Sequence, residues 1–176
     1  MHNKLAILGF RGIGKSTVSR ILAKSMKIPL YAIDAEIEKK EGKSIATIVE
    51  ENGWNYFRDR ELDHINMQSE REKVILDCGG GILEGHDGEY SEEKGEMLKK
   101  NFFCVYLFLP DEKLLTRLKY LQQKSSRPPL AGDTEKILKK RKPWFEKIAH
   151  VQINTDGLTA GQTVSRIMKE LVKNNA

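Results

Sequence analysis

The sequence predicts an α/β fold in which a parallel five-stranded sheet is flanked by helices. Three observations lead to this prediction. Short apolar segments alternate with amphipathic segments along the 176 residues. A glycine-rich motif separates the first apolar segment from the first amphipathic one. The run from Val74 to Leu76 has no polar position, which is typical of a strand buried on both faces. Because strands separated by helices form parallel sheets, we expect three layers, with helices on both faces of the sheet.

The first half of the chain divides where the hydrophobic period changes. Consecutive apolar residues predict a strand, and apolar residues that recur every three or four positions predict a helix. In the first helical segment, Val18, Ile21 and Leu22 share one face. The elements expected here are a strand at Leu5–Gly9, a helix at Lys15–Met26, a strand at Pro29–Asp34, a charge-rich helical segment at Ala35–Asn52 that is broken near Gly42, a helix at Asn55–Glu72 and a strand at Lys73–Cys78.

The second half follows the same rule but contains two segments with neither period. The polar, acidic segment Glu84–Glu93 is interpreted as a solvent-exposed loop. The Ser-, Pro- and Gly-rich segment at about 124–132 is interpreted as a mobile lid, since long loops of α/β enzymes often close over ligands. The regular elements expected here are a strand at Phe103–Phe108, a helix at Asp111–Lys124, a helix at Asp133–His150, a strand at Val151–Asn154 and a helix at Thr159–Asn174.

Length and composition predict one domain, residues 1–176, with a mass of 20.1 kDa. No apolar segment reaches membrane-spanning length and no signal-peptide pattern is present, so we expect a cytoplasmic protein that binds no membrane. Cys78 and Cys104 lie in apolar segments and are predicted to be reduced core thiols. The net charge of +5 favours anionic ligands without choosing among them.

The most specific motif is a phosphate-binding loop. Residues 9–16 read GFRGIGKS, a complete G-x-x-x-x-G-K-[ST], between a predicted strand and a predicted helix. Glycines let the backbone N–H groups point inward, and the helix N-terminus favours an anion. Lys15 is expected to contact the β- and γ-phosphates, and Ser16 to ligate Mg²⁺. The motif therefore predicts binding of a purine nucleoside triphosphate, most simply ATP, and leaves the phosphoryl acceptor open.

The acceptor site is predicted from residues at the ends of other elements. Asp34 ends the second predicted strand, and Gly79-Gly80-Gly81 follows the third. Arg58 and Glu61 lie one turn apart on a predicted helix, so Glu61 can hold Arg58 in position. Arg141 shares a helix face with apolar residues, and a charge on an inward face needs a partner. An internal salt bridge is one interpretation of each arginine. Two such arginines beside a phosphate-binding loop favour a carboxylate ligand instead.

With these residues in view, the sequence resembles the shikimate kinase family over essentially its whole length. The phosphate-binding loop by itself is generic, whereas the F-R-x-x-E motif, the triple glycine and the Arg-Pro segment together are specific to that family. The matching motifs, in family order, are GFRGIGKST at 9–17, Asp34 with Glu36-Ile37-Glu38, Gly42-Lys43-Ser44-Ile45, Phe57-Arg58 with Glu61, Gly79-Gly80-Gly81, Arg127-Pro128-Pro129-Leu130, and Arg141 before Pro143.

The resemblance implies a P-loop NTPase fold and ATP-dependent phosphorylation of the shikimate 3-hydroxyl, on the route to the aromatic amino acids. Asp34 would bind shikimate hydroxyls and orient or deprotonate the attacking one. Arg127, on the lid, would contact the transferring phosphate. The implied catalytic residues are Lys15, Asp34 and Arg127, the nucleotide-binding residues are Arg11, Gly12, Ile13, Gly14, Lys15, Ser16, Thr17, Arg117 and Arg127, and the substrate-binding residues are Asp34, Arg58, Gly79, Gly80, Gly81 and Arg141.

One departure from the family concerns the metal. The family usually carries two carboxylates at the end of the second strand, but this sequence reads Ala32-Ile33-Asp34. Asp77, at the end of the third predicted strand, is our candidate for the missing magnesium-shell carboxylate, together with Ser16 as a metal ligand. The alternative is that Asp77 caps the glycine-rich turn by accepting hydrogen bonds from nearby backbone N–H groups.

Two rival functions stay open on the sequence. One is a kinase of the same fold that acts on another small hydroxy acid. The other is a non-catalytic nucleotide-binding module. Nucleic-acid binding is not expected, because no basic stripe with interleaved aromatic residues is present. The expected partners are ATP and shikimate, bound by a monomer. ATP consumption that depends on added shikimate would distinguish shikimate kinase activity from both rival functions.

Overall fold

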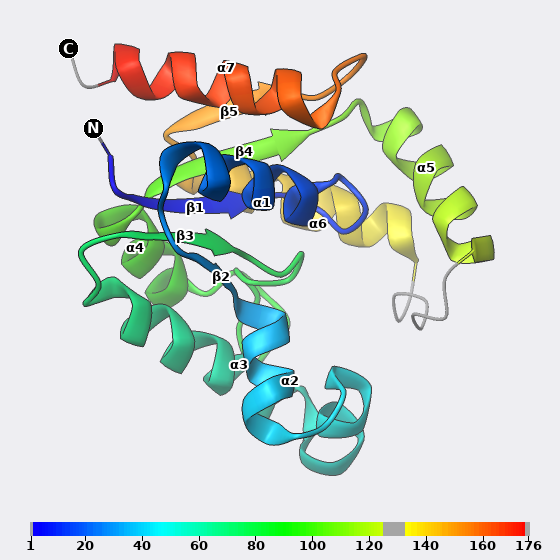
Figure 1. Ribbon diagram of the computed structural model, residues 1–176. Coiled ribbons are helices and arrows are strands. Elements are labelled where there is room, and N and C mark those ends of the chain that lie inside the picture. The colour runs from blue at the N-terminus through cyan, green and yellow to red at the C-terminus, as the bar shows by residue number, and fades with distance from the viewer. Residues whose placement is uncertain (1, 125–132, 175–176) are drawn as a thin grey trace.

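Five parallel strands form one sheet with the order β2-β3-β1-β4-β5 (Figure 1). The computed structural model describes residues 2–124 and 133–174. The strands are β1 (Lys4–Leu8), β2 (Leu30–Ala32), β3 (Val74–Asp77), β4 (Phe103–Phe108) and β5 (Val151–Asn154). The helices are α1 (Lys15–Met26), α2 (Ile33–Glu41), α3 (Ile45–Ser69), α4 (Glu92–Asn101), α5 (Asp111–Lys124), α6 (Thr134–Ile148) and α7 (Ala160–Lys173). The predicted parallel five-stranded α/β fold is therefore confirmed.

Strand β1 lies at the centre and divides the core into two halves. Its side chains point alternately to the two faces, as they do in any strand. Leu5 and Ile7 pack in one apolar cluster with residues of α1 and α7, whereas Ala6 and Leu8 pack in another with residues of α3, α4 and α6. All four side chains are fully buried. The sheet is thus covered on both faces, which explains why its strands read as continuous apolar runs.

The register of the sheet determines what meets at its carboxyl edge. Ile7 of β1 is paired with Asp77 of β3, and Asp77 is in turn paired with Ala32 of β2. The strands all run in the same direction, so the segments after β1, β2 and β3 leave from one edge (Figure 1). These segments contain the predicted phosphate-binding loop, Asp34 and the triple glycine.

The structure corrects two predicted elements. Strand β2 ends at Ala32, so Asp34 lies in the first turn of α2 and not at a strand end. The predicted gap between Asn52 and Asn55 is confirmed, because α3 consists of two helical stretches that meet at a kink, where Gly53 has the non-helical angles φ 82° and ψ 167°. Helix α4 was not predicted at all. Its signal was present: Ser91 caps the helix by accepting a hydrogen bond from the N–H of Lys94, and two glutamates follow the cap.

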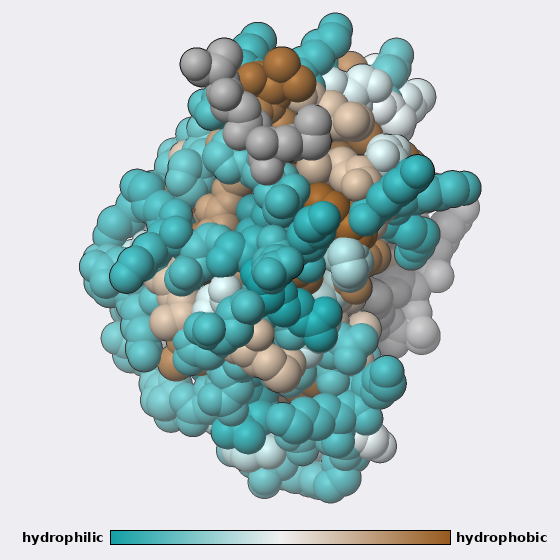
Figure 2. Space-filling model, turned by 60° about the vertical axis from the view of Figure 1, so that its left-hand side comes forward, coloured by the Kyte–Doolittle hydropathy of each residue, from teal (hydrophilic) through white to brown (hydrophobic). Residues whose placement is uncertain are grey.

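The hydropathy of the surface and the state of the two cysteines agree with what the amino-acid composition predicts. No helix within residues 2–124 and 133–174 is long and apolar enough to cross a membrane. The face seen in Figure 2 is mostly hydrophilic, and apolar side chains form small separate patches on it. Cys78 and Cys104 are free and buried, as predicted.

Candidate active site

The phosphate-binding loop curls tightly between β1 and α1. Gly12 and Gly14 adopt positive φ angles of 82° and 103°, where a side chain would be strained. A Cβ atom at Gly12 would also lie only 2.7 Å from Leu118 of α5. The loop can therefore follow this path only with glycines, and it ends at the N-terminus of α1, the end of a helix that favours an anion.

Lys15 is held over this loop. It is the first residue of α1, it is 9% exposed, and its Nζ donates a hydrogen bond of 3.1 Å to the carbonyl oxygen of Phe10. The ammonium group thus bridges the two ends of the loop. Ser16 and Thr17 follow as exposed residues on the same first turn. A polyphosphate lying in the loop would meet a cation and two hydroxyl groups here.

Arg117 of α5 reaches the same loop. A Cβ atom built on Gly14 would lie 3.9 Å from Nη2 of Arg117, so the guanidinium group is beside the N-terminus of α1. This position is compatible with the nucleotide-binding role that the family resemblance implies for Arg117. Arg127 and residues 125–132 of the predicted lid lie outside the described residues.

The triple glycine is the point where three parts of the site come together. A Cβ atom on Gly79 would lie 2.6 Å from Oδ1 of Asp34, and one on Gly80 would lie 3.0 Å from the backbone nitrogen of Arg11. A Cβ atom on Gly81 would lie 2.9 Å from Nη2 of Arg58 and 3.2 Å from Nη2 of Arg141. The predicted acceptor residues and the phosphate-binding loop therefore surround one short backbone segment.

Asp34 is a carboxyl group with a raised pKa. Burial raises the pKa of Asp34 from 3.8 to about 6, and the negative charge of Glu61 adds to this effect. The positive charge of Lys15 opposes it. A carboxylate with a pKa near 6 is ionised at neutral pH yet basic enough to accept a proton in a reaction. Asp34 can therefore act as a general base for a hydroxyl group beside it.

Arg58 belongs to a buried ionic network. Its Nη1 donates to Oε2 of Glu61 at 2.9 Å, and Nζ of Lys94 donates to the same oxygen at 2.9 Å. The three residues are 5%, 1% and 3% exposed. Because charges this deeply buried are stable only with partners, Glu61 and Lys94 fix the position of Arg58.

The two arginines converge on a residue that the sequence analysis misplaced. Nη2 of Arg58 and Nη2 of Arg141 both donate to Oε2 of Glu84, and the second distance is 2.8 Å. Nη1 of Arg141 donates to the carbonyl oxygen of Gly80 at 3.2 Å. The expectation that the whole segment Glu84–Glu93 is a solvent-exposed loop is therefore wrong for Glu84.

Glu84 and Lys94 are the site residues that sequence reasoning missed. The sequence contained a weak indication that each residue lies near the site. Glu84 follows the triple glycine closely enough to share its location, and Lys94 lies in the first turn of a helix with a serine cap. Nothing local indicates that either residue is buried, because their partners are 26 and 33 positions away in the sequence.

Asp77 lies beside Ala32, the position where the resemblance implies a carboxylate. It is 8% exposed, and the sheet register pairs it directly with Ala32. Its charge contributes to the raised pKa of Asp34, so the two carboxylates are neighbours. Within residues 78–82, which are all described, no backbone N–H donates to the Asp77 side chain. The hydrogen bonds expected from a turn cap are thus missing.

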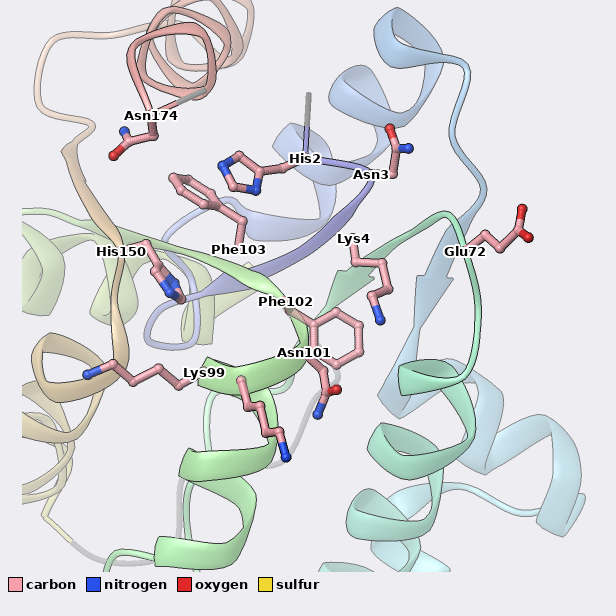
Figure 3. A pocket seen from close by; sticks show the side chains of 11 residues that line it. His2, Asn3, Lys4, Glu72, Lys99, Asn101, Phe102, Phe103, His150 and Asn174 are labelled. Atoms are coloured by element: carbon pink, nitrogen blue, oxygen red, sulfur yellow. The ribbon is translucent and has the colours of Figure 1, made fainter. Parts of the chain in front are cut away.

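A separate hollow lies at the opposite edge of the sheet (Figure 3). It has a volume of about 450 Å³ and lies where β1 and β4 begin, between Lys4, Phe103 and His150. The phosphate-binding loop, Asp34 and the triple glycine follow the carboxyl ends of β1, β2 and β3, so this hollow belongs to a different part of the molecule.

Comparison with known proteins points to one family. A family model described as "Shikimate kinase" matches residues 11–172. A shikimate kinase of Leptospira biflexa is 34% identical, and the match covers 93% of each chain. Shikimate kinase 1 of Yersinia enterocolitica is 33% identical, with 96% of this chain and 95% of the relative covered. The solved structure of the Acinetobacter baumannii shikimate kinase in complex with shikimate has a TM-score of 0.84 at 30% identity, and covers 99% of this chain and 95% of that one.

Proposed function

The chain belongs to the shikimate kinase family. We propose that separate groups of its residues bind the acceptor, accept its proton and bind the phosphates during phosphoryl transfer. The enzyme transfers the γ-phosphoryl group of ATP to the 3-hydroxyl of shikimate, with Mg²⁺, and yields shikimate 3-phosphate for aromatic amino acid biosynthesis. One observation carries the assignment of residues: the triple glycine lies within contact distance of Asp34, of the phosphate-binding loop and of both arginines.

The acceptor is bound by its carboxylate and its hydroxyl groups. Arg58 and Arg141 bind the carboxylate, since two guanidinium groups that point to one place suit a planar anion. Gly79, Gly80 and Gly81 let the ring approach the backbone closely. Asp34 then contacts the hydroxyl groups from the other side of the glycines.

Asp34 accepts the proton of the attacking hydroxyl. The hydroxyl oxygen forms a bond to the γ-phosphorus, the bond from that phosphorus to the β,γ-bridging oxygen breaks, and the proton moves to the Asp34 carboxylate. A pKa of about 6 suits this role, because the carboxylate is mostly ionised at pH 7 and still basic enough to share the proton.

The phosphates are bound by the loop and by Lys15. Backbone N–H groups of the loop and of the start of α1, together with the ammonium of Lys15, offset the negative charge of the polyphosphate. Arg117 lies beside Gly14 and contacts the nucleotide. Arg127 completes this set as a proposed phosphate contact from the lid. When bound, Mg²⁺ would supply positive charge that offsets the charge developing on the transferring phosphoryl group.

Ser16 and Asp77 are the residues that would hold Mg²⁺. The hydroxyl of Ser16 lies on the first turn of α1, and Asp77 extends from the neighbouring strand. Asp77 takes the part that the family gives to a carboxylate at position 32. The direct pairing of Ala32 with Asp77 and the lack of a turn-capping hydrogen bond in residues 78–82 support this.

We also propose that residues 1–176 form one domain that acts as a cytoplasmic monomer without nucleic acid. The large apolar side chains that are exposed in the described residues support the monomer, because they are spread over β2, α3, α5 and α7 and not gathered on one element: Leu30, Trp54, Met67, Tyr120, Leu121, Met168 and Val172. The free thiols suit a reducing compartment.

The first test measures ADP formation with and without shikimate. We expect turnover that depends on shikimate, which neither a non-catalytic module nor a kinase for a different hydroxy acid would give. Lys15→Ala should abolish this turnover while the far-ultraviolet circular dichroism spectrum stays unchanged, since alanine is at least as good a helix former as lysine at the start of α1. Near-normal turnover in Lys15→Ala would refute the assignment.

The second test separates the arginines from the nucleotide site. Arg58→Ala or Arg141→Ala should weaken shikimate binding by roughly tenfold to a hundredfold, because each loses a charge-assisted hydrogen bond. Calorimetric titration with ATP should give a nearly unchanged Kd. Equal losses for both ligands would assign the arginines to the structure alone.

A further inference from the structure

The carboxylate of Glu84 lies where the two arginines of the acceptor site converge. One of its oxygens, Oε2, accepts hydrogen bonds from both Arg58 and Arg141. A substrate carboxylate bound by the same pair would use these donors in the same way. A side chain of the protein itself therefore has the chemistry and the position of the expected ligand group.

Glu84 differs from Glu61, the other carboxylate on Arg58. Glu61 lies inside α3, is 1% exposed and is bound by Lys94 as well, so it stays in place. Glu84 stands at the start of the polar loop before α4, and its side chain is 17% exposed. Water is thus within reach of Glu84 but not of Glu61.

Only the side chain of Glu84 would need to move. Its N–H donates to the carbonyl oxygen of Gly81 at 2.9 Å, and its own carbonyl oxygen accepts from Nζ of Lys94 at 3.0 Å. These bonds fix the backbone. Rotation about the side-chain bonds is enough to carry the carboxylate away from the arginines and toward solvent.

A second carboxylate beside Glu84 would place two like charges at one point. Oε2 of Glu84 already accepts from Nη2 of both arginines, where a bound carboxylate would accept as well. The other two terminal nitrogens donate to Glu61 and to the carbonyl oxygen of Gly80. Each terminal nitrogen carries two N–H groups, so donors are left over, and it is the repulsion between the like charges that drives one of the two anions out.

We propose that Glu84 is a built-in occupant of the carboxylate subsite, which shikimate displaces when it binds. The proposal rests on the proposed function, in which Arg58 and Arg141 bind the shikimate carboxylate. In the empty enzyme Glu84 keeps both buried arginines paired and pointing to one place. Displacement lowers the affinity for shikimate by the fraction of time that the subsite is free. It also discriminates against neutral cyclic alcohols, which have no charge with which to replace Glu84.

The test is calorimetric titration of shikimate against the wild-type enzyme and Glu84→Gln. The glutamine keeps the size of the side chain and removes its charge. If Glu84 occupies the subsite about nine-tenths of the time, the Kd for shikimate falls about tenfold in the variant, and the KM falls with it. A residue that merely supported the structure would weaken binding when replaced. An unchanged or larger Kd therefore overturns the proposal.

A matched control and a second variant complete the test. Glu89→Gln removes a carboxylate from the same loop. The Glu89 carboxylate lies outside the site and forms an ion pair with Lys140, with 2.6 Å between Oε1 and Nζ. This variant should leave the Kd for shikimate at the wild-type value, and an equal gain in Glu89→Gln would overturn the proposal. Glu84→Ala should tighten binding as Glu84→Gln does. If wild-type enzyme forms no ADP with shikimate, the proposed function fails. If it does and Glu84 has no effect, only this inference fails.

Discussion

Asp34 combines a functional position with a cost in stability. The pKa of Asp34 is about 6 in the folded protein, whereas the ordinary value for an aspartate, taken for the unfolded chain, is 3.8. Folding therefore disfavours the ionised form. Below pH about 4 the carboxyl is protonated in both states and the cost is absent. As the pH rises through 6 the full cost appears, about 2–3 kcal/mol by the usual conversion. The enzyme thus keeps a base ready at the expense of stability.

Asp34→Asn should separate these two effects. At pH 8 we expect the free energy of unfolding to increase by up to about 2–3 kcal/mol, because the buried charge is gone. The gain should disappear near pH 4. Turnover should fall by about 10²–10⁴, the usual contribution of a general base. Urea unfolding at the two pH values, together with an assay at pH 8, measures both.

The wild-type pH profile offers an independent check on the same residue. We expect kcat/KM to decline as the pH falls through about 6, since the protonated carboxyl cannot accept the substrate proton. The decline should be absent in the residual activity of Asp34→Asn. A flat profile between pH 5 and 8 in the wild type would contradict the assignment of Asp34 as the base.

Asp77 can be tested through the metal. Asp77→Asn should raise the Mg²⁺ concentration needed for half-maximal activity, because Asn lacks the charge that holds the magnesium shell. Adding Ala32→Asp to this variant should bring the Mg²⁺ concentration for half-maximal activity part of the way back to the wild-type value, since positions 32 and 77 are paired in the sheet. The turn-capping alternative expects a mild effect, because Asn also caps turns. An unchanged Mg²⁺ requirement in Asp77→Asn decides for that alternative.

At the scale of elements, the glycine turn after β3 positions the acceptor residues. Its three residues are close to groups from α2, from the phosphate-binding loop, and from α3 and α6. A side chain at any of them would push on a different part of the site. The absence of side chains in this turn leaves room for those groups, which explains three consecutive glycines in a segment that is buried at Gly79 and half-buried at Gly80 and Gly81.

Gly81→Ala should weaken binding of the acceptor and leave binding of the nucleotide unchanged. Its Cβ atom would lie 2.9 Å from the guanidinium of Arg58 and 3.2 Å from that of Arg141, so both must shift. We expect shikimate binding to weaken by about tenfold or more, because misplaced donors lose their geometry. ATP binding should stay near the wild-type value. Gly85→Ala, in the loop that follows, is the control, and equal effects of the two variants on shikimate binding would contradict this reasoning.

At the scale of the whole molecule, the two ligands contact different parts of the fold. The phosphate-binding loop leaves β1, which is paired on both sides, so nucleotide binding acts at the centre of the sheet. The acceptor residues lie mostly on the helices of one face, α2, α3 and α6. Each ligand should therefore stabilise the folded state by itself.

Thermal unfolding tests this division. A non-hydrolysable ATP analogue at 100 times its Kd should add about 2.7 kcal/mol of stability. For a chain of this size the Tm should rise by roughly 5–10 °C. Shikimate at the same excess should give a comparable rise. Lys15→Ala should lose the shift with the nucleotide and keep the shift with shikimate, and loss of both shifts would show that the sites are not separable.

Local patterns in the sequence determined most of the fold and much of the site. The glycine-rich loop, α1 and the cap of α7 at Thr159 follow from residues within a few positions of one another. The same holds for the period of the apolar residues, which separates strands from helices. The motif residues Lys15 and Arg58 could be singled out for this reason.

Only the tertiary structure decided which side chains meet. Glu84 lies between two arginines that are 26 and 57 positions away, and Asp77 lies beside Ala32 because of the sheet register. No local pattern encodes these distances. They arise when parallel strands bring their carboxyl ends to one edge and the helices behind them bury charges that only a distant partner can stabilise.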